Sequence, residues 1–327
     1  MSHGFEDSSY LTLPEATGAR EKQRRRTKLL ARRVLASLPF CVLLFLATVV
    51  TTLIVGAHLA ANYAAARPLF DLDVSWAFFA GLFDHPSRLW AGAPYAFSAI
   101  AILLAHEMGH YLTCRRYHIQ ATYPYFLPAP TVVGTWGAFI QIKSSLATRQ
   151  ELFDIGISGP IAGFLVAVPM LIVAAADAGR RTAALPREAL VIGHPLAITL
   201  LARLFHPTIA SAHLALTPLG GGVWVGLFVT ALNLIPIGQL DGGHIFYAAF
   251  GRAHRYVSIA FFVALIPMGY FYWPGWWLWA VLMIVIGLRH PPPLIDSEPL
   301  DRWRKLLVLA ALAMLVLCFM PSPLSVT

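Results

Sequence analysis

The sequence has little charge and few cysteines. Only 12% of its 327 residues are charged, whereas 58% are hydrophobic. Soluble domains average about 25% charged residues, so this shortage argues against a soluble enzyme and predicts a polytopic membrane protein. The three cysteines, Cys41, Cys114 and Cys318, lie in or beside apolar runs and show no CxxC spacing. Neither a disulfide framework nor a thiolate metal site is expected.

Stretches without charge predict about seven transmembrane helices. A span needs about 20 apolar residues. The candidate spans are residues 38–61, 92–114, 153–176, 222–236 with a further piece at 241–250, 257–273, 276–288 and 306–320. The longest weakly apolar connection, residues 177–221, is too short for a domain of about 100 residues. Its middle, residues 196–205, is predicted to be an amphipathic helix on the outer surface.

Basic residues predict the orientation. The run REKQRRRTKLLARR, residues 20–33, directly precedes the first span and should stay on the cytoplasmic side. Nucleic-acid binding is the alternative explanation of such a run. Its position favours a topology signal that contacts anionic lipids, so we expect a lipid bilayer and no nucleic acid as partner. If the spans alternate, the cytoplasmic side also contains Arg115, Arg116, Arg252, Arg255, Arg289, Arg302, Arg304 and Lys305, which supports the predicted number of spans. Three basic residues then lie on the outer side and weaken that number: Arg180, Arg181 and Arg187.

One predicted span contains three ionisable residues. His106, Glu107 and His110 form the pattern HExxH within residues 92–114. Positions four apart share one face of a helix, so the two imidazoles can bind one zinc ion and the glutamate can take a proton from water. Buried polar residues that hydrogen-bond between helices are the alternative. Ionisable groups at membrane depth are rare, however, and usually mark a functional site.

A third ligand is expected from another span, because catalytic zinc usually has three protein ligands. The segment NLIPIGQLDGGH, Asn233 to His244, follows an apolar helix and interrupts it with Pro236 and Gly238. Such a break frees backbone groups that protein or cavity water must satisfy. The carboxylate of Asp241 is therefore the predicted third ligand. The alternative is that Asp241 caps the helix formed by residues 242–250.

The loop from Ile119 to Ser145 has a pattern unlike that of a span. It is rich in proline, tyrosine and glycine and then alternates from Phe139 to Lys143, which predicts a strand or hairpin in a re-entrant, β-like loop. A strand edge cannot face lipid but can line a cavity, where an extended substrate could pair with it. Phe139 and Ile140 are therefore candidate substrate-binding residues. The alternative is a structural loop that seals the cavity.

Together, HEMGH and the later N-x-x-P-x-x-x-L-D-G-G resemble the site-2 protease family of intramembrane zinc metalloproteases. The resemblance covers about residues 92–252 and includes SGPIAGF at 158–164 and GTWGAFIQIKS at 134–145. It implies that His106, His110 and Asp241 are zinc ligands and that Glu107 is the general base. Asn233 would hydrogen-bond the substrate backbone or the developing oxyanion. No PDZ-like insert is present, which indicates a compact member.

His244 also matches a frequent residue of that family, and its role stays open. It could support the ligands, donate a proton, or begin a helix, and we favour the structural role. The resemblance completes a division of the chain into four segments. These are a basic cytoplasmic tail (1–36), the first span with an external connection (37–91), a catalytic membrane core (92–252) and the C-terminal spans (253–327).

We therefore predict an all-α polytopic membrane protein that acts as an intramembrane zinc metalloprotease with one zinc ion. Its expected substrate is a single-span membrane protein cut within or near its transmembrane segment, and the site should face the cytoplasm. A bacterial plasma membrane is expected, with an organelle membrane as the alternative. Two other functions remain: a membrane zinc protease of lipidated peptides, against which the aspartate ligand argues, and a non-catalytic zinc transporter or scaffold, against which the lack of a visible repeat argues.

Overall fold

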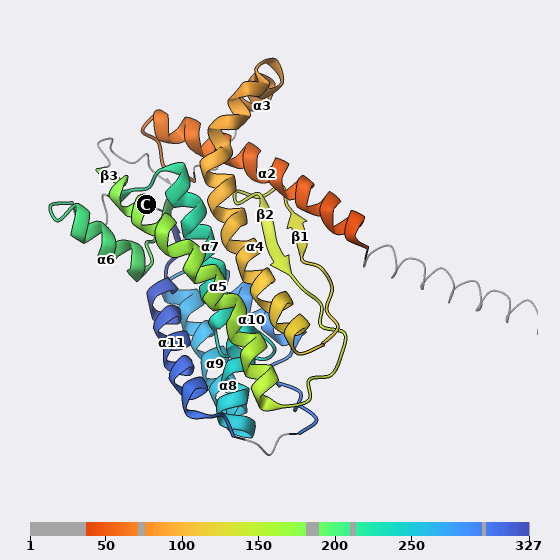
Figure 1. Ribbon diagram of the computed structural model, residues 1–327. Helices are drawn as coiled ribbons and strands as arrows, with labels where there is room; N and C mark the ends of the chain where they lie inside the picture. The colour runs from red at the N-terminus through yellow and green to blue at the C-terminus, as the bar shows by residue number, and fades with distance from the viewer. Residues whose placement is uncertain (1–36, 71–75, 181–189, 210–213, 296–298, 327) are drawn as a thin grey trace, which may run out of the picture.

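The computed structural model describes residues 37–70, 76–180, 190–209, 214–295 and 299–326. The predicted tail with its basic run lies outside these residues, as do Arg181 and Arg187. Within them the protein is mostly helical (Figure 1). The helices are α2 (Leu38–Ala64), α3 (Trp76–Asp84), η1 (Pro86–Gly92), α4 (Ala93–Arg116), α5 (Arg149–Ala176), α6 (Leu196–Phe205), α7 (Pro218–Leu234), α8 (Asp241–Phe250), η3 (Gly251–Ala253), α9 (His254–Phe271), α10 (Gly275–Ile286) and α11 (Arg302–Cys318).

In the described residues, three small antiparallel sheets of two strands accompany the helices. They pair β1 (Tyr125–Pro128) with β2 (Thr135–Phe139), β3 (Gly179–Arg180) with β5 (Leu214–Ala215), and β4 (Leu190–Ile192) with β6 (Leu324–Val326). The helix predicted at residues 196–205 is confirmed as α6, and its place at a membrane surface stays a prediction.

The described part of the chain contains four helical stretches that are long and apolar enough to cross a membrane. They are Leu38–Ala64, Pro86–Arg116, Arg149–Ala176 and Asp241–Phe271. A membrane protein is therefore supported, but the predicted number of seven spans is not confirmed. The helices expected to supply further spans are short: α7 and α11 have 17 residues and α10 has 12. At 1.5 Å per residue, about 20 residues are needed to cross the apolar core.

The fourth stretch, Asp241–Phe271, is two helices and not one straight rod. Gly251 ends α8 with a φ of 57°, in the left-handed region. Ser258 in α9 then accepts a hydrogen bond from the backbone N–H of Gly238, at 3.2 Å, and donates one to the carbonyl of Leu288, at 2.9 Å. A straight helix would carry Ser258 about 25 Å from the start of α8. The chain therefore turns back at η3, as the separate pieces predicted from the sequence require.

Helix α4 packs between α5 and α7 because small residues let the backbones approach closely. A Cβ added to Gly109 would lie 2.4 Å from the carbonyl oxygen of Ser158 in α5. On the other side, a Cβ at Gly222 of α7 would lie 2.1 Å from the hydroxyl of Ser98. Glycines at such contacts are typical of helices packed in a membrane. The helix with the HExxH pattern thus lies against α5 and α7, with α2 and the β1–β2 hairpin also beside it (Figure 1).

Three helix ends are joined by one polar cluster. The guanidinium of Arg304 in α11 donates two hydrogen bonds to Asp154 in α5, at 2.8 and 2.7 Å. The hydroxyl of Tyr117, at the end of α4, donates a third to the same carboxylate. Arg115 and Arg116 therefore lie at the same end of the bundle as the start of α11, as the predicted orientation requires.

The loop after α4 forms a hairpin, as its alternating pattern predicts. Tyr125 pairs with Phe139, and an isolated bridge from Ala121 to Ile142 extends the pairing. The hairpin lies beside α2 and α4 (Figure 1). The hydroxyl of Thr51 in α2 donates to the carbonyl of Gly134 at its tip, at 2.6 Å. That this hairpin re-enters a membrane is not established by its geometry.

Candidate metal centre

The two histidines of α4 turn their rings toward α5. The Nδ1–H of His110 donates a hydrogen bond of 2.7 Å to the backbone carbonyl of Ile155. This contact fixes the tautomer and leaves Nε2 available as a metal ligand. The Nε2 atoms of His106 and His110 lie 3.1 Å apart, and both residues are buried. The HExxH pattern therefore forms on one helix face, as its spacing predicts.

Two glycines of α5 make room for these rings. A Cβ at Gly159 would lie 2.1 Å from Nε2 of His110, and a Cβ at Gly163 would lie 3.2 Å from Cβ of His106. Both glycines belong to the SGPIAGF segment, to which sequence analysis assigned no role at the site. Their spacing of four residues is typical of close helix contacts and could have indicated one.

The interrupted helix between Asn233 and His244 brings the carboxylate of Asp241, the predicted third ligand, to the two histidines. Helix α7 ends at Leu234, and α8 begins at Asp241 with Leu240 as its N-cap. No side chain caps this helix, so the alternative of Asp241 as an N-cap residue is wrong. Its carboxylate oxygen Oδ2 instead lies 3.0 Å from Nε2 of His106 and 3.3 Å from Nε2 of His110.

The three donor atoms fit a zinc ion. In a tetrahedral site with bonds of about 2.0–2.1 Å, neighbouring ligand atoms lie about 3.3 Å apart. The distances of 3.0, 3.1 and 3.3 Å match this spacing. Two imidazole nitrogens and one carboxylate oxygen are also an ordinary donor set for catalytic zinc, with a fourth position open. Within the described ranges, this is the group of histidine, cysteine, aspartate and glutamate residues that could hold a metal ion.

All the predicted site residues line one cavity of about 220 Å³. Glu107 is 5% exposed there. Its carboxylate lies close enough to the backbone N–H of Ile140, which follows β2, to accept a hydrogen bond. The amide Nδ2 of Asn233 lies 3.3 Å from Nε2 of His106, beside the donor atoms. Phe139 and Ile140 also line this cavity. The structure thus brings these residues together, while their individual roles stay predictions.

A second cavity, of about 460 Å³, adjoins the first and shares lining residues with it. Both cavities are lined by Ile140, Ile142, Gln239 and His244. The second continues over the Pro291–Pro293 segment, beside His290. Neither Gln239 nor His290 is among the residues predicted from the sequence. Gln239 lies two residues before Asp241 in the interrupted segment, whereas the fold alone brings His290 to the cavity.

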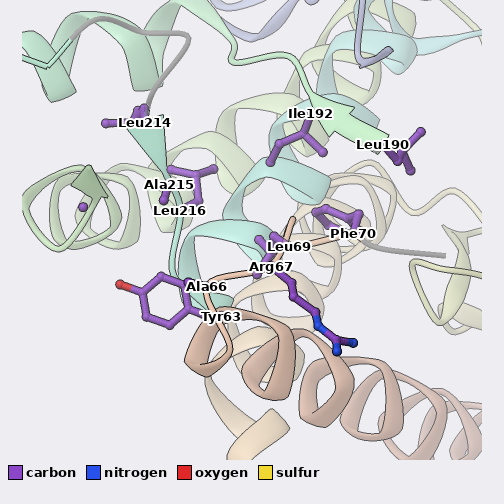
Figure 2. Close-up of a pocket in the computed structure, with 11 residues that line it drawn as sticks. Tyr63, Ala66, Arg67, Leu69, Phe70, Leu190, Ile192, Leu214, Ala215 and Leu216 are labelled. Atoms are coloured by element: carbon purple, nitrogen blue, oxygen red, sulfur yellow. The ribbon is translucent and has the colours of Figure 1, made fainter. Parts of the chain in front are cut away.

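Another cavity, of about 250 Å³, lies beyond the end of α2 (Figure 2). Leu69, Phe70, Leu190 and Ile192 form much of its wall. Among the described residues that line it, Arg67 is the one with a charge, and none is a histidine, cysteine or acid.

Comparison with known families agrees with the metal centre. The model of peptidase family M50 matches residues 94–272, which contain all three donor residues and Glu107. The chain belongs to this family. The resemblance to site-2 proteases is thereby confirmed.

Named relatives are plant proteins. The chain is 33% identical over 249 residues to the probable zinc metalloprotease EGY1, chloroplastic, of Arabidopsis thaliana, covering 71% of the chain and 43% of that protein. For EGY1 of Oryza sativa subsp. japonica the identity is 31%, over 70% of the chain and 40% of the relative. For the Arabidopsis EGY2 it is 26%, over 75% and 44%. The chain thus spans less than half the length of these relatives.

Proposed function

We propose that the protein is an intramembrane zinc metalloprotease. The observation that carries this proposal is the convergence of three donor atoms on one point beside Glu107, in a cavity formed by apolar helices. Neither alternative function has such support. The aspartate ligand argues against a protease of lipidated peptides, and the single convergent cluster among the described residues argues against a transport path.

Each residue of the cavity has a separate role in the proposed peptide hydrolysis. His106, His110 and Asp241 would hold zinc, which when bound polarises a carbonyl and lowers the pKa of water. The carboxylate of Glu107 accepts the proton of the attacking water and later delivers it to the leaving amine. The side-chain amide of Asn233 donates a hydrogen bond to the substrate oxygen that gains charge, a contact worth about 3 kcal/mol in comparable sites.

The substrate would bind as an extended strand along the hairpin. The carbonyl of Gln141 accepts from the N–H of Thr122 at 3.0 Å, and the N–H of Lys143 donates to Gln120 at 2.8 Å. Backbone groups alternate in direction along a strand, so those of Ile142 point to the opposite side, toward the cavities. A peptide could pair there by strand addition, with Phe139 and Ile140 as neighbours. A single-span substrate would therefore have to unwind before cleavage.

The orientation is also part of the proposal. We expect seven spans, a re-entrant hairpin, a cytoplasmic N-terminus, and a site that opens toward the basic end of the bundle. The cluster of Tyr117, Asp154 and Arg304 at one end supports this orientation. The relatives' names place those proteins in chloroplasts. They give no support to a bacterial plasma membrane, and they favour the organelle membrane that was the alternative.

The experiment uses the purified chain in liposomes with a single-span reporter substrate and added zinc. We expect Glu107→Gln to retain zinc and to reduce cleavage at least about hundredfold, because general base catalysis contributes about 10²–10⁴-fold. Asp84→Asn, an exposed acid outside the cavity, is the matched control and should cleave normally. Cleavage by Glu107→Gln at the wild-type rate would refute the proposal.

A further inference from the structure

A chain of aromatic and imidazole rings leads away from the metal centre. Nδ1 of His244 in α8 lies 2.6 Å from Nε2 of His290, which follows α10. Nδ1 of His290 in turn lies 2.6 Å from the carbonyl oxygen of Pro291. The ring of His290 stacks on Tyr247, with centroids 4.6 Å apart and an angle of 26° between the planes. His290 is held firmly, although it lies outside the residues that match the family model.

The carbonyl of Pro291 determines the protonation of both rings. A carbonyl oxygen can only accept, so Nδ1 of His290 carries the proton. Burial lowers the pKa of His290 to about 3, so this ring is neutral near pH 7 and its Nε2 carries a lone pair. Nδ1 of His244 must then be the donor of the 2.6 Å bond. In the neutral ring this leaves Nε2 of His244 as a hydrogen-bond acceptor.

That acceptor stands where a substrate would pass. His244 lines both the metal cavity and the second cavity, as do Ile140 and Ile142. Its Nε2 makes no hydrogen bond within the described part of the chain. An extended peptide paired with Ile142 would turn its alternate N–H groups away from the hairpin, toward the wall that contains His244.

We propose that Nε2 of His244 accepts a hydrogen bond from a backbone N–H of the bound substrate, and that His290 is the positioning residue that makes it an acceptor. The inference rests on the proposed protease function and adds a substrate-recognition element to it. A second metal site is the competing explanation. His254 nearby has a buried Nε2 without a partner, but no three donor atoms converge there among the described residues.

The test combines protein variants with synthetic single-span substrates in liposomes. In each substrate one amide near the cut site is replaced by an ester, which removes one N–H donor and weakens the adjoining carbonyl as an acceptor. The comparison between protein variants isolates the part of the effect that depends on His244. We expect one position at which the ester lowers kcat/KM of the wild type about tenfold. At that position the ester should leave kcat/KM of His244→Ala unchanged, because the acceptor nitrogen is missing. It should also leave kcat/KM of His290→Ala unchanged, because the ring of His244 is no longer held with Nε2 as the acceptor.

His290→Gln is the conservative variant, since its amide can accept from His244 and donate to Pro291. It should keep the wild-type ester effect and most of the activity, whereas His290→Ala should lose about tenfold to hundredfold. His85→Gln, an exposed histidine outside the cavity, is the control and should match the wild type. Zinc content is measured for each variant, to show that the ligand set is intact.

Equal ester effects in the wild type, His244→Ala and His290→Ala at every position would overturn the inference and leave the protease function standing. If the wild type cleaves no substrate, or if cleavage persists in Glu107→Gln, the proposed function fails and this inference fails with it. The two failures are thus distinguishable in one set of assays.

Discussion

Gly159 shows how a residue without functional groups can decide the chemistry of the site. Its missing side chain leaves the space that the ring of His110 occupies, with the backbone of α5 against the imidazole. The carbonyl of Ile155 can orient His110 because this contact is so close. The metal centre therefore depends on α5 as much as on the residues that donate to the ion.

We predict that Gly159→Ala weakens zinc binding by about tenfold or more, as changes in the support of metal ligands commonly do. The added Cβ would lie 2.1 Å from Nε2 of His110 and must displace the ring. Zinc affinity is measured by competition with a chelator. Gly179→Ala is the control, because its nearest neighbour would be a hydroxyl 3.9 Å away. Equal affinities of the two variants would contradict this role.

At the same scale, the convergence of His106, Glu107, His110 and Asp241 could be predicted from sequence, because local spacing and residue type indicate it. The i, i+4 histidines fix one face, and an acid beside a broken helix is rare in a membrane. His290 could not be assigned, because its contacts join distant elements. The spacing of Gly159 and Gly163 could have indicated a close helix contact, but not which ring would fill the space. The alternative role of Asp241 as the N-cap of α8 is wrong by one residue, since a first helical residue and an N-cap look alike in sequence.

At the scale of elements, the cluster of Tyr117, Asp154 and Arg304 holds α4, α5 and α11 together. We predict that Arg304→Met lowers the free energy of unfolding by about 1–3 kcal/mol, because it leaves the carboxylate of Asp154 without its bidentate partner. The measurement is thermal unfolding in detergent. Arg302→Met, exposed two residues earlier, should change stability little. Equal melting temperatures for the two variants would show that the cluster contributes nothing.

The helices and the hairpin were largely predictable, whereas the number of spans was not. Long apolar runs gave α2, α4 and α5, and alternation gave the β1–β2 hairpin. The apolar runs that end the chain form helices of 12 to 18 residues. Apolar sequence of that length suits a buried helix or a short span equally, so composition cannot separate the two.

For the whole molecule, orientation is the property that composition alone suggests and that labelling can test. The native cysteines Cys41, Cys114 and Cys318 are free and buried, which gives a low background. We predict that a membrane-impermeant maleimide applied from the non-cytoplasmic side labels Asp177→Cys in intact membranes. The same reagent should label Arg116→Cys only after the membrane has been permeabilised. These exposed positions end α5 and α4. Labelling of both from one side would contradict the predicted orientation.

The central claim is that His106, His110 and Asp241 together hold one zinc ion beside Glu107. Its most direct test is metal analysis of the purified wild type, His110→Ala and Asp241→Ala, with Asp84→Asn as control. The account predicts about one zinc per chain in the wild type and the control, and large losses in both ligand variants. Full zinc occupancy in Asp241→Ala would contradict it, because the carboxylate that joins the two halves of the site would then not be a ligand.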